Sequence, residues 1–305
     1  MTDDWPYAFK LGVVLEEIHP DPEVSLPFAR DLGMTHVEFG SLWGRPLDQT
    51  SEADRERMRE LLHQHGLQVA MVGPSTFKMV YLGHLRLDEL ASDPPFRREL
   101  ESMRRVLEAA RYFGSPLART FSFRREGMVG LGNPSPRLPA GGEIEPGMLE
   151  KLGHALRLIC EVADEAGVDL GLENVRSCWA NTGHNTRRIV EAVGSPHLKV
   201  VWDPANAFVS GEEAAFPEGY DQVKPYVAHV HLKDARLLDP ATGLTAWERI
   251  GDGEVDYKGQ LAALMADGYR GVVSVETHYQ PAGKSPAEAT RLTTQGLRAV
   301  LASLS

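Results

Sequence analysis

The chain has 305 residues, 42% hydrophobic and 25% charged, which is the composition of an ordinary globular protein. Lys and Arg number 32 against 43 Asp and Glu, and the formal net charge of -11 disfavours a nucleic-acid partner because phosphate backbones are repelled. No apolar run is long enough for a membrane span, and the acidic start MTDDWPYAFK lacks a secretory signal. We therefore expect a cytoplasmic protein with no membrane partner, whose two cysteines are reduced thiols.

The main regularity along the chain is a helical pattern that ends in glycine and leads into a short apolar run. It occurs in LGMTHVEF, HGLQVAMV, FGSPLART, AGVDLGLE, VGSPHLKVVW and DGYRGVVSVE. In each segment the glycine suits a left-handed helix C-cap, and the β-branched run suits a buried strand. Two further runs, FKLGVVLE and YVAHVHLK, have the same strand composition. The sequence therefore predicts eight strands.

Helices are predicted between these strands. One covers residues 97–113, another begins near Pro146, and Ser51 and Ser285 suit helix starts, whereas proline interrupts the first and sixth helices. Eight alternations predict an α/β fold, a single (β/α)8 TIM barrel spanning residues 1–305, rather than an open doubly wound sheet. The irregular stretch 124–147 follows the fourth strand and is predicted to form a lid over the barrel mouth.

Acidic and histidine side chains fall at the ends of the last four strands. Strand five ends at Glu173, strand six at Asp203 and strand eight at Glu276, and strand seven contains HVHLKD. The carboxyl ends of the strands meet at the barrel mouth, so we expect these side chains to lie together. Each strand residue rises about 3.3 Å, which places His231 nearer the mouth than His229. His229 is expected to fill the interior or to hold a supporting hydrogen bond.

Three carboxylates and one imidazole predict one divalent metal ion, held by Glu173, Asp203, His231 and Glu276. Manganese is favoured, and magnesium, cobalt and zinc stay open. The alternatives are helix capping for any single acid and an ion-paired rim for the set.

The candidate substrate-binding residues are Asn206, Lys233, Arg236, Glu38, Trp43 and His184. Ordinary alternatives exist: a turn for Asn206, a solvated surface for Arg236 and helix capping for Glu38. Lys233 reaches the site only if the chain bends after its strand, because regular alternation points it away from His231. Trp43 and His184 lie in loops, where packing is the alternative role. Residues 283–285 suit a phosphate site, but a capping box explains Ser285 equally well, so phosphorylation of the substrate stays open.

The sequence resembles the xylose isomerase-like TIM barrel superfamily of sugar isomerases and epimerases in GMTHVEFG, GLENV, KVVWDPAN, HVHLKD, GDGEVDY and GVVSVETH. In its single-metal members the ligands are a Glu, an Asp, a His and a Glu, which match Glu173, Asp203, His231 and Glu276. Ketose 3-epimerases carry a histidine where this chain has Asn206 and an arginine six residues after the ligand histidine, whereas Arg236 falls five after it. The HLKD motif is more similar to that of the inosose dehydratase and general isomerase branches of the superfamily.

A divalent ion at this site can bind two neighbouring oxygens of a hydroxy-ketone and stabilise the enediolate formed when the adjacent carbon loses its proton. Glu173 and Glu276 are the predicted catalytic residues that remove and return this proton. We therefore expect a metal-dependent isomerase or epimerase of a small-molecule sugar or polyol ketone. A lyase, which shares the first step, and a non-catalytic sugar-binding barrel stay open, as does a homo-oligomer. The acidic charge disfavours phosphodiester hydrolysis.

Overall fold

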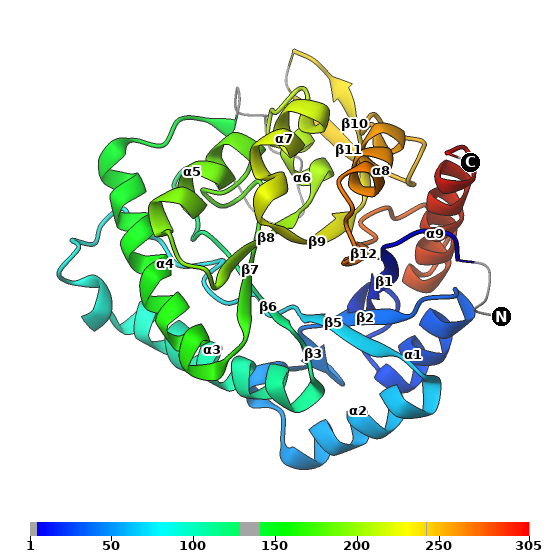
Figure 1. Cartoon of the computed structure of the whole chain (residues 1–305), viewed down its shortest axis with the longest axis horizontal. Coiled ribbons are helices and arrows are strands. Elements are labelled where there is room, and N and C mark those ends of the chain that lie inside the picture. The colour runs from blue at the N-terminus through cyan, green and yellow to red at the C-terminus, as the bar shows by residue number, and fades with distance from the viewer. Residues whose placement is uncertain (1–4, 129–140, 242, 305) are drawn as a thin grey trace.

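Eight parallel strands close into a barrel in the order β1-β12-β9-β8-β7-β6-β5-β2, and β1 also pairs with β2 (Figure 1). The structure is a computed structural model that describes residues 5–128, 141–241 and 243–304. The barrel strands are β1 (Lys10–Val14), β2 (His36–Phe39), β5 (Gln68–Val72), β6 (Leu117–Thr120), β7 (Asp169–Glu173), β8 (Leu198–Trp202), β9 (Val227–Leu232) and β12 (Val272–Val275). Each predicted run contains one of them, so the predicted (β/α)8 barrel is confirmed.

Helices connect the strands and cover the outside of the barrel (Figure 1). They are α1 (Pro22–Asp31), α2 (Glu52–His65), α3 (Pro94–Phe113), α4 (Pro146–Ala166), α5 (Gly183–Val193), α6 (Pro204–Val209), α7 (Tyr220–Val223), α8 (Tyr257–Ala266) and α9 (Pro286–Ala302). Short single-turn helices are η1 (Leu15–Glu17), η2 (Leu47–Gln49), η3 (Leu90–Ser92), η5 (Ala215–Gly219) and η6 (Lys224–Tyr226). None of the helices in the described part of the chain has the length and apolar character needed to cross a bilayer.

The ends of the helices follow the predicted chemistry. Ser51 and Ser285 form the capping boxes of α2 and α9. The left-handed C-caps of α2, α3, α4 and α5 are Gly66, Gly114, Gly167 and Gly194. The sixth helical connection is divided among α6, η5, α7 and η6, as its prolines predicted. The predicted interruption of the first helix is wrong, because α1 runs without a break through Pro27.

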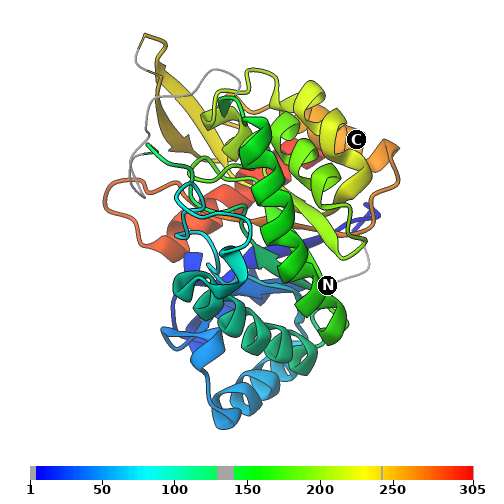
Figure 2. The ribbon, with the colours of Figure 1, turned by 90° about the vertical axis from the view of Figure 1, so that its left-hand side faces the viewer.

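Two antiparallel hairpins outside the barrel were not predicted. The hairpin of β3 (Ser41–Leu42) and β4 (Arg45–Pro46) follows β2, and the hairpin of β10 (Asp234–Asp239) and β11 (Leu244–Glu248) follows β9. The longer hairpin projects away from the barrel (Figure 2). Residues 129–140 of the predicted lid lie outside the described residues. On its near side, Arg124 forms an isolated antiparallel bridge with Cys178.

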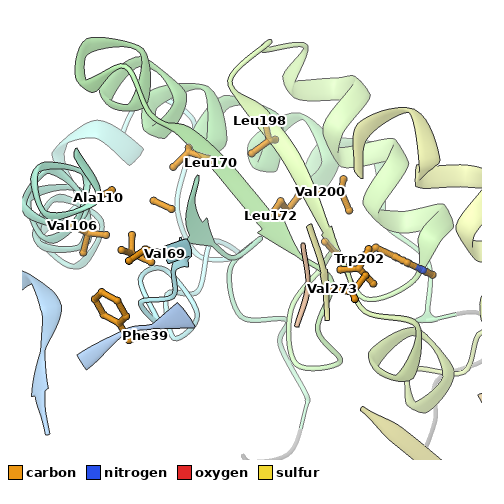
Figure 3. Close-up of a cluster of buried hydrophobic side chains, with 14 of the residues drawn as sticks. Phe39, Val69, Val106, Ala110, Leu170, Leu172, Leu198, Val200, Trp202 and Val273 are labelled. Atoms are coloured by element: carbon orange, nitrogen blue, oxygen red, sulfur yellow. The ribbon is translucent and has the colours of Figure 1, made fainter. Parts of the chain in front are cut away.

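The hydrophobic core lies mainly between the barrel strands and the helices. Figure 3 shows buried side chains from both layers, among them Leu170 and Leu172 of β7. These leucines alternate with Gly171 and Glu173, so the strand period of two directs Glu173 to the opposite face of the sheet. Full burial of a leucine contributes roughly 1.5–3 kcal/mol, which makes this frame a stable support for polar groups at the strand ends.

Candidate functional site

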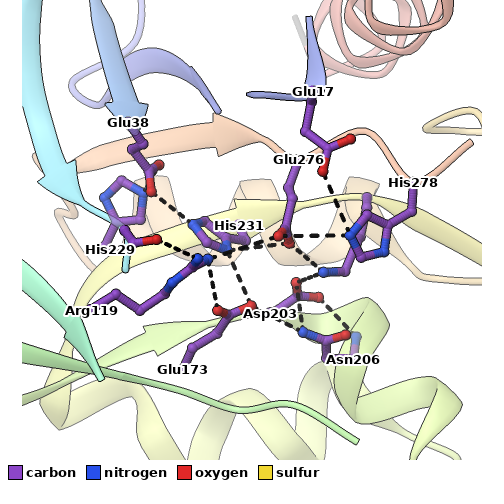
Figure 4. A network of polar contacts seen from close by, with 12 residues as sticks. Glu17, Glu38, Arg119, Glu173, Asp203, Asn206, His229, His231, Glu276 and His278 are labelled. Carbon is purple, nitrogen blue, oxygen red and sulfur yellow. Dashed lines mark hydrogen bonds and ion pairs between the residues drawn. The ribbon is translucent and has the colours of Figure 1, made fainter. Parts of the chain in front are cut away.

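Four side chains that the sequence singles out meet at the carboxyl end of the barrel. Glu173 ends β7, Asp203 follows β8, His231 lies in β9 and Glu276 follows β12. All four are buried, and one donor atom from each lies within 4.8 Å of the others. His231 Nδ1 is 3.4 Å from Glu173 Oε1 and 3.4 Å from Glu276 Oε2 (Figure 4). The structure thus brings the four predicted ligands together.

Asp203 both caps a helix and faces the site. Its Oδ1 accepts a hydrogen bond of 2.8 Å from the Asn206 backbone N–H, which caps α6. The Asn174 side chain fixes the Asp203 backbone with two hydrogen bonds of 2.8 Å: its Nδ2 donates to the Asp203 carbonyl, and its Oδ1 accepts from the Asp203 N–H. Asn206 Nδ2 donates to Asp203 Oδ2 at 3.1 Å and to Glu173 Oε1 at 3.2 Å. Asn206 therefore fixes two carboxylates relative to each other, so capping and membership of the site coexist here.

Glu38 orients both histidines of strand β9. Its Oε1 is 2.7 Å from His229 Nε2, and its Oε2 is 3.1 Å from His231 Nε2. Burial raises the pKa of Glu38, but the two imidazoles outweigh it and hold that pKa well below its ordinary value. With Nε2 engaged, His231 directs Nδ1 toward Glu173 and Glu276. The helix-capping alternative for Glu38 is wrong, because this side chain points into the barrel, and His229 holds the supporting hydrogen bond expected of it.

Lys233 turns into the site because β9 ends at Leu232 and the strand alternation stops there. Its Nζ is 2.8 Å from Asp203 Oδ2 and also contacts Glu276 Oε2. The Tyr257 hydroxyl hydrogen-bonds to the Lys233 backbone carbonyl and lies 3.2 Å from its backbone N–H. Lys233 is 2% exposed, so its charge is compensated almost entirely by these carboxylates.

Arg119 of β6 is a site residue that the sequence analysis missed. Its Nη1 is 3.1 Å from Glu173 Oε2 and 3.9 Å from Glu276 Oε1, and its Nη2 donates to the Gly73 carbonyl at 2.7 Å. Burial and the Glu276 charge raise the pKa of Glu173, but Arg119 and His231 outweigh them and lower it to about 2. The available signal was a single charged residue inside the strand run LART.

Glu17 and His278 extend the cluster and were also missed. His278 Nε2 is 3.8 Å from Glu17 Oε1 and 3.8 Å from Glu276 Oε1. Burial and the Glu276 charge raise the pKa of Glu17 to about 8, and burial with the Lys233 charge lowers that of His278 to about 4. Their positions in the sequence could have indicated them, because Glu17 follows strand one and His278 lies two residues after Glu276.

Three predicted substrate contacts lie outside this cluster. Arg236 is on the β10–β11 hairpin, exposed and 3.4 Å from Glu248. Trp43 is half-buried in the turn between β3 and β4, and His184 is exposed in the first turn of α5. The hairpin after β9, which was not predicted, carries Arg236 away from the strand end.

Residues 283–285, which the sequence suggested as a phosphate site, form the start of α9. Ser285 and Glu288 form the capping box of α9, and Lys284 Nζ is 3.2 Å from Glu288 Oε1. The amide and ammonium groups that would hold a phosphate therefore already have partners.

A cavity of about 380 Å³ adjoins the cluster. Its polar lining includes Glu16, Glu17, Glu38, Ser41, Arg119 and Glu276. Glu16 Oε1 accepts the Gly40 and Ser41 backbone N–H groups at 2.7 and 2.8 Å, so it joins the segment after β2 to η1. A side chain at Gly40 would lie 2.3 Å from the Gly73 carbonyl oxygen, so the wall there requires glycine.

The donor set fits a divalent metal ion. Three carboxylates and one imidazole converge, which is the oxygen-rich mixture that suits such ions. Four buried carboxylates, including Glu38, face two permanent cations in this cluster, Arg119 and Lys233. Burial lowers the pKa of His231, but Glu38, Glu276 and Glu173 outweigh it and hold that pKa well above its ordinary value, so His231 adds positive charge in the metal-free protein. A metal-bound imidazole is neutral, which leaves a deficit of two positive charges. Burial raises the pKa of Asp203 to about 6 despite Lys233, as expected of a carboxylate crowded by others. One divalent cation would cancel the deficit.

A closed parallel barrel with a candidate metal centre and a cavity at the carboxyl ends of its strands has the arrangement of a barrel enzyme. The xylose isomerase-like TIM barrel family matches residues 26–300, and the chain belongs to this family.

Relatives of the chain include isomerases and epimerases. The inosose isomerase of Bacillus velezensis is 30% identical over 136 residues, which cover 43% of this chain and 48% of that protein. The D-psicose 3-epimerase of Enterocloster bolteae is 28% identical over 113 residues, 36% of this chain and 37% of that protein. These matches thus span less than half of the curated relatives. The crystal structure of a xylose isomerase domain protein from Planctomyces limnophilus, 19% identical, covers 98% of this chain and 99% of its own with a TM-score of 0.71, which shows the shared fold.

Proposed function

We propose that the protein is a divalent-metal-dependent isomerase or epimerase of a neutral sugar or polyol ketone, with manganese as the favoured ion. The observation that carries the proposal is the convergence of Glu173, Asp203, His231 and Glu276 beside a cavity that Glu276 also lines. The matched relatives, an inosose isomerase and a D-psicose 3-epimerase, support the same class of reaction.

Glu173 and Glu276 are the groups that move the proton. A bound divalent ion would supply Lewis-acid polarisation of the substrate carbonyl and of its neighbouring hydroxyl. Arg119 contacts both glutamates and keeps them ionised, which a proton acceptor requires. Return of the proton to the neighbouring carbon isomerises the substrate, and return to the opposite face of the same carbon epimerises it. Asn206 and Glu38 hold Glu173 and His231 in place.

The cavity favours a substrate without phosphate. Glu16, Glu38 and Glu276 line it, and their carboxylates can accept hydrogen bonds from sugar hydroxyls but would repel an anion. Glu17, whose pKa is raised to about 8, adds a neutral carboxyl group that can also bind a hydroxyl. Arg119 also lines it but is already engaged by Glu173 and the Gly73 carbonyl. The start of α9, where barrels often bind phosphate, is occupied by its own capping box.

A lyase is the second candidate, because Glu17 adds a further carboxyl group to the wall of the same cavity. After proton removal by Glu276, a group there could protonate a departing β-hydroxyl or β-alkoxyl oxygen, which would turn the shared first step into an elimination.

Proton exchange tests the proposal. The Mn²⁺-loaded protein is incubated in deuterated water with neutral ketoses, inososes and the matching ketose phosphates. Deuterium uptake by a neutral ketone without loss of a leaving group is expected, whereas an ultraviolet-absorbing enone would identify a lyase. The double variant Glu173→Gln, Glu276→Gln should lose exchange, and Glu191→Gln, on the exposed face of α5, should keep it. Sugar binding without exchange of any carbon-bound proton would refute catalysis and leave a binding barrel.

A further inference from the structure

We propose that Lys233 is a resident cation that holds the metal-binding carboxylates together in the metal-free protein and competes with the divalent ion for them. The inference rests on the metal site of the proposed function. Removing the charge of Lys233 should therefore strengthen metal binding and lower the stability of the metal-free protein.

The ammonium contacts two of the donor atoms that a metal ion needs. Asp203 Oδ1 is engaged in capping α6, so Oδ2 is its donor atom, and Lys233 Nζ lies 2.8 Å from it. Glu276 Oε2, which is 3.4 Å from His231 Nδ1, is the second oxygen that Lys233 contacts. An ion bound to both oxygens would share them with a like-charged ammonium group.

The surroundings of Lys233 keep the ammonium in this position. The Tyr257 hydroxyl fixes the backbone of residue 233 just past the end of β9. The Trp247 ring lies 5.6 Å from Nζ and covers it on the side of the β10–β11 hairpin. With 3% of its side chain exposed, Lys233 interacts with the carboxylates at low dielectric, where the interaction is poorly screened by solvent.

Lys233 is the one salt-bridge partner recorded for Asp203 in the described part of the chain, since Arg119 pairs with Glu173 and Glu276 and His231 acts on Asp203 without such a contact. Without a metal ion, loss of Lys233 would leave Asp203 as a buried carboxylate without a salt-bridge partner, which is strongly destabilising. With a metal ion, the same loss removes repulsion between two cations. Metal affinity and metal-free stability are therefore linked in opposite directions through one side chain.

Metal titration of charge-removing and charge-keeping variants tests the inference. Lys233→Met removes the charge and keeps the side-chain length, Lys233→Arg keeps the charge, and Lys199→Met removes a lysine that lies 4.0 Å from Asp169, a residue at the other end of the barrel strands. After removal of metal with a chelator, Mn²⁺ binding is measured by calorimetry and thermal unfolding is recorded with and without Mn²⁺. Lys233→Met should bind Mn²⁺ at least about tenfold more tightly and unfold at a lower temperature without metal. Lys233→Arg should not gain affinity, and Lys199→Met should match the wild type.

A folded Lys233→Met variant that binds Mn²⁺ no more tightly than the wild type would overturn the inference. Absence of Mn²⁺ binding by the wild type is a different result, because it would refute the metal site of the proposed function itself. A measurement on the wild type covers the case in which Lys233→Met does not fold. Binding of diamagnetic Mg²⁺ should displace the ammonium from its place over Trp247 and change the indole emission, and Trp247→Phe should remove that change. Unchanged emission at saturating Mg²⁺ would also overturn the inference.

Discussion

Arg119→Met should destabilise the metal-free protein by about 3–5 kcal/mol, the cost of breaking a buried ion pair from one side. The guanidinium is 3.1 Å from Glu173 Oε2, donates to the Gly73 carbonyl at 2.7 Å and has 13% of its side chain exposed. Solvent cannot replace these contacts, because the Glu173 side chain that would lose its partner is only 3% exposed. Methionine fills most of the volume, so the loss reports the charge and the hydrogen bonds rather than a cavity.

Urea unfolding in the presence of a chelator measures this loss, since bound metal would otherwise stabilise the same carboxylates. Arg104→Met is the matched control, because Arg104 pairs with Glu165 at 2.6 Å but the two side chains are 48% and 64% exposed. An exposed pair of this kind contributes at most about 1 kcal/mol. Arg119→Lys should fall between the two, because it keeps the charge but loses part of the hydrogen bonding. Equal losses for Arg119→Met and Arg104→Met would refute the reasoning.

Glu38→Gln should weaken Mn²⁺ binding roughly 10- to 100-fold in calorimetry, because Glu38 orients His231; unchanged affinity would contradict that role. Removal of metal with a chelator should lower the unfolding temperature, and Mn²⁺ should restore it, whereas an unfolding temperature indifferent to both would argue against the metal site. His36 is neutral in the fold because burial lowers its pKa from 6.5 to about 4, so unfolding takes up a proton below pH 6.5. This group therefore reduces stability as pH falls from 6.5 to 4, and His36→Asn should remove up to about 3 kcal/mol of that decline in urea titrations; parallel curves for both proteins would contradict it.

The barrel and the meeting of the four candidate ligands could be predicted because both depend on local patterns. A glycine stop followed by a β-branched run marks each helix-to-strand passage, and parallel strands in a closed barrel place their carboxyl ends at one mouth. Given those two rules, Glu173, Asp203 and Glu276 had to lie near one another. His231 could be chosen over His229 as the ligand only because the rise along the strand places it nearer the barrel mouth.

The remaining site residues depend on geometry that spacing does not encode. Lys233 enters the cluster because β9 ends one residue before it, while strand alternation alone would have directed it outward. Glu38 lies on β2, which does not pair with any strand that carries a candidate ligand, so it comes close to His231 only after the barrel closes. Arg119 lies on β6, which pairs with the strand of Glu173, but its sequence position does not tell which face of that strand it occupies. Arg236 is carried away by a hairpin whose turn signals were not recognised.

The ligand cluster and the cavity come from opposite sides of the barrel, and this predicts an order for the two proposed proton carriers. Glu276 lines the cavity directly, whereas Glu173 has one oxygen on Arg119 and the other on Asn206. A substrate in the cavity should therefore give its proton to Glu276 first. Glu173 is ionised in the resting site, so it should deliver a proton in the second step only after taking one up from solvent, while Glu276 releases its proton to solvent. Glu276→Gln should abolish deuterium exchange into the substrate, by a factor of about 100 or more. Glu173→Gln should retain exchange but lose product formation. Mn²⁺ affinity is measured on both variants, and exchange is assayed at saturating Mn²⁺, so that the difference is not caused by loss of the ion. The reverse pattern of exchange would show that Glu173 acts first.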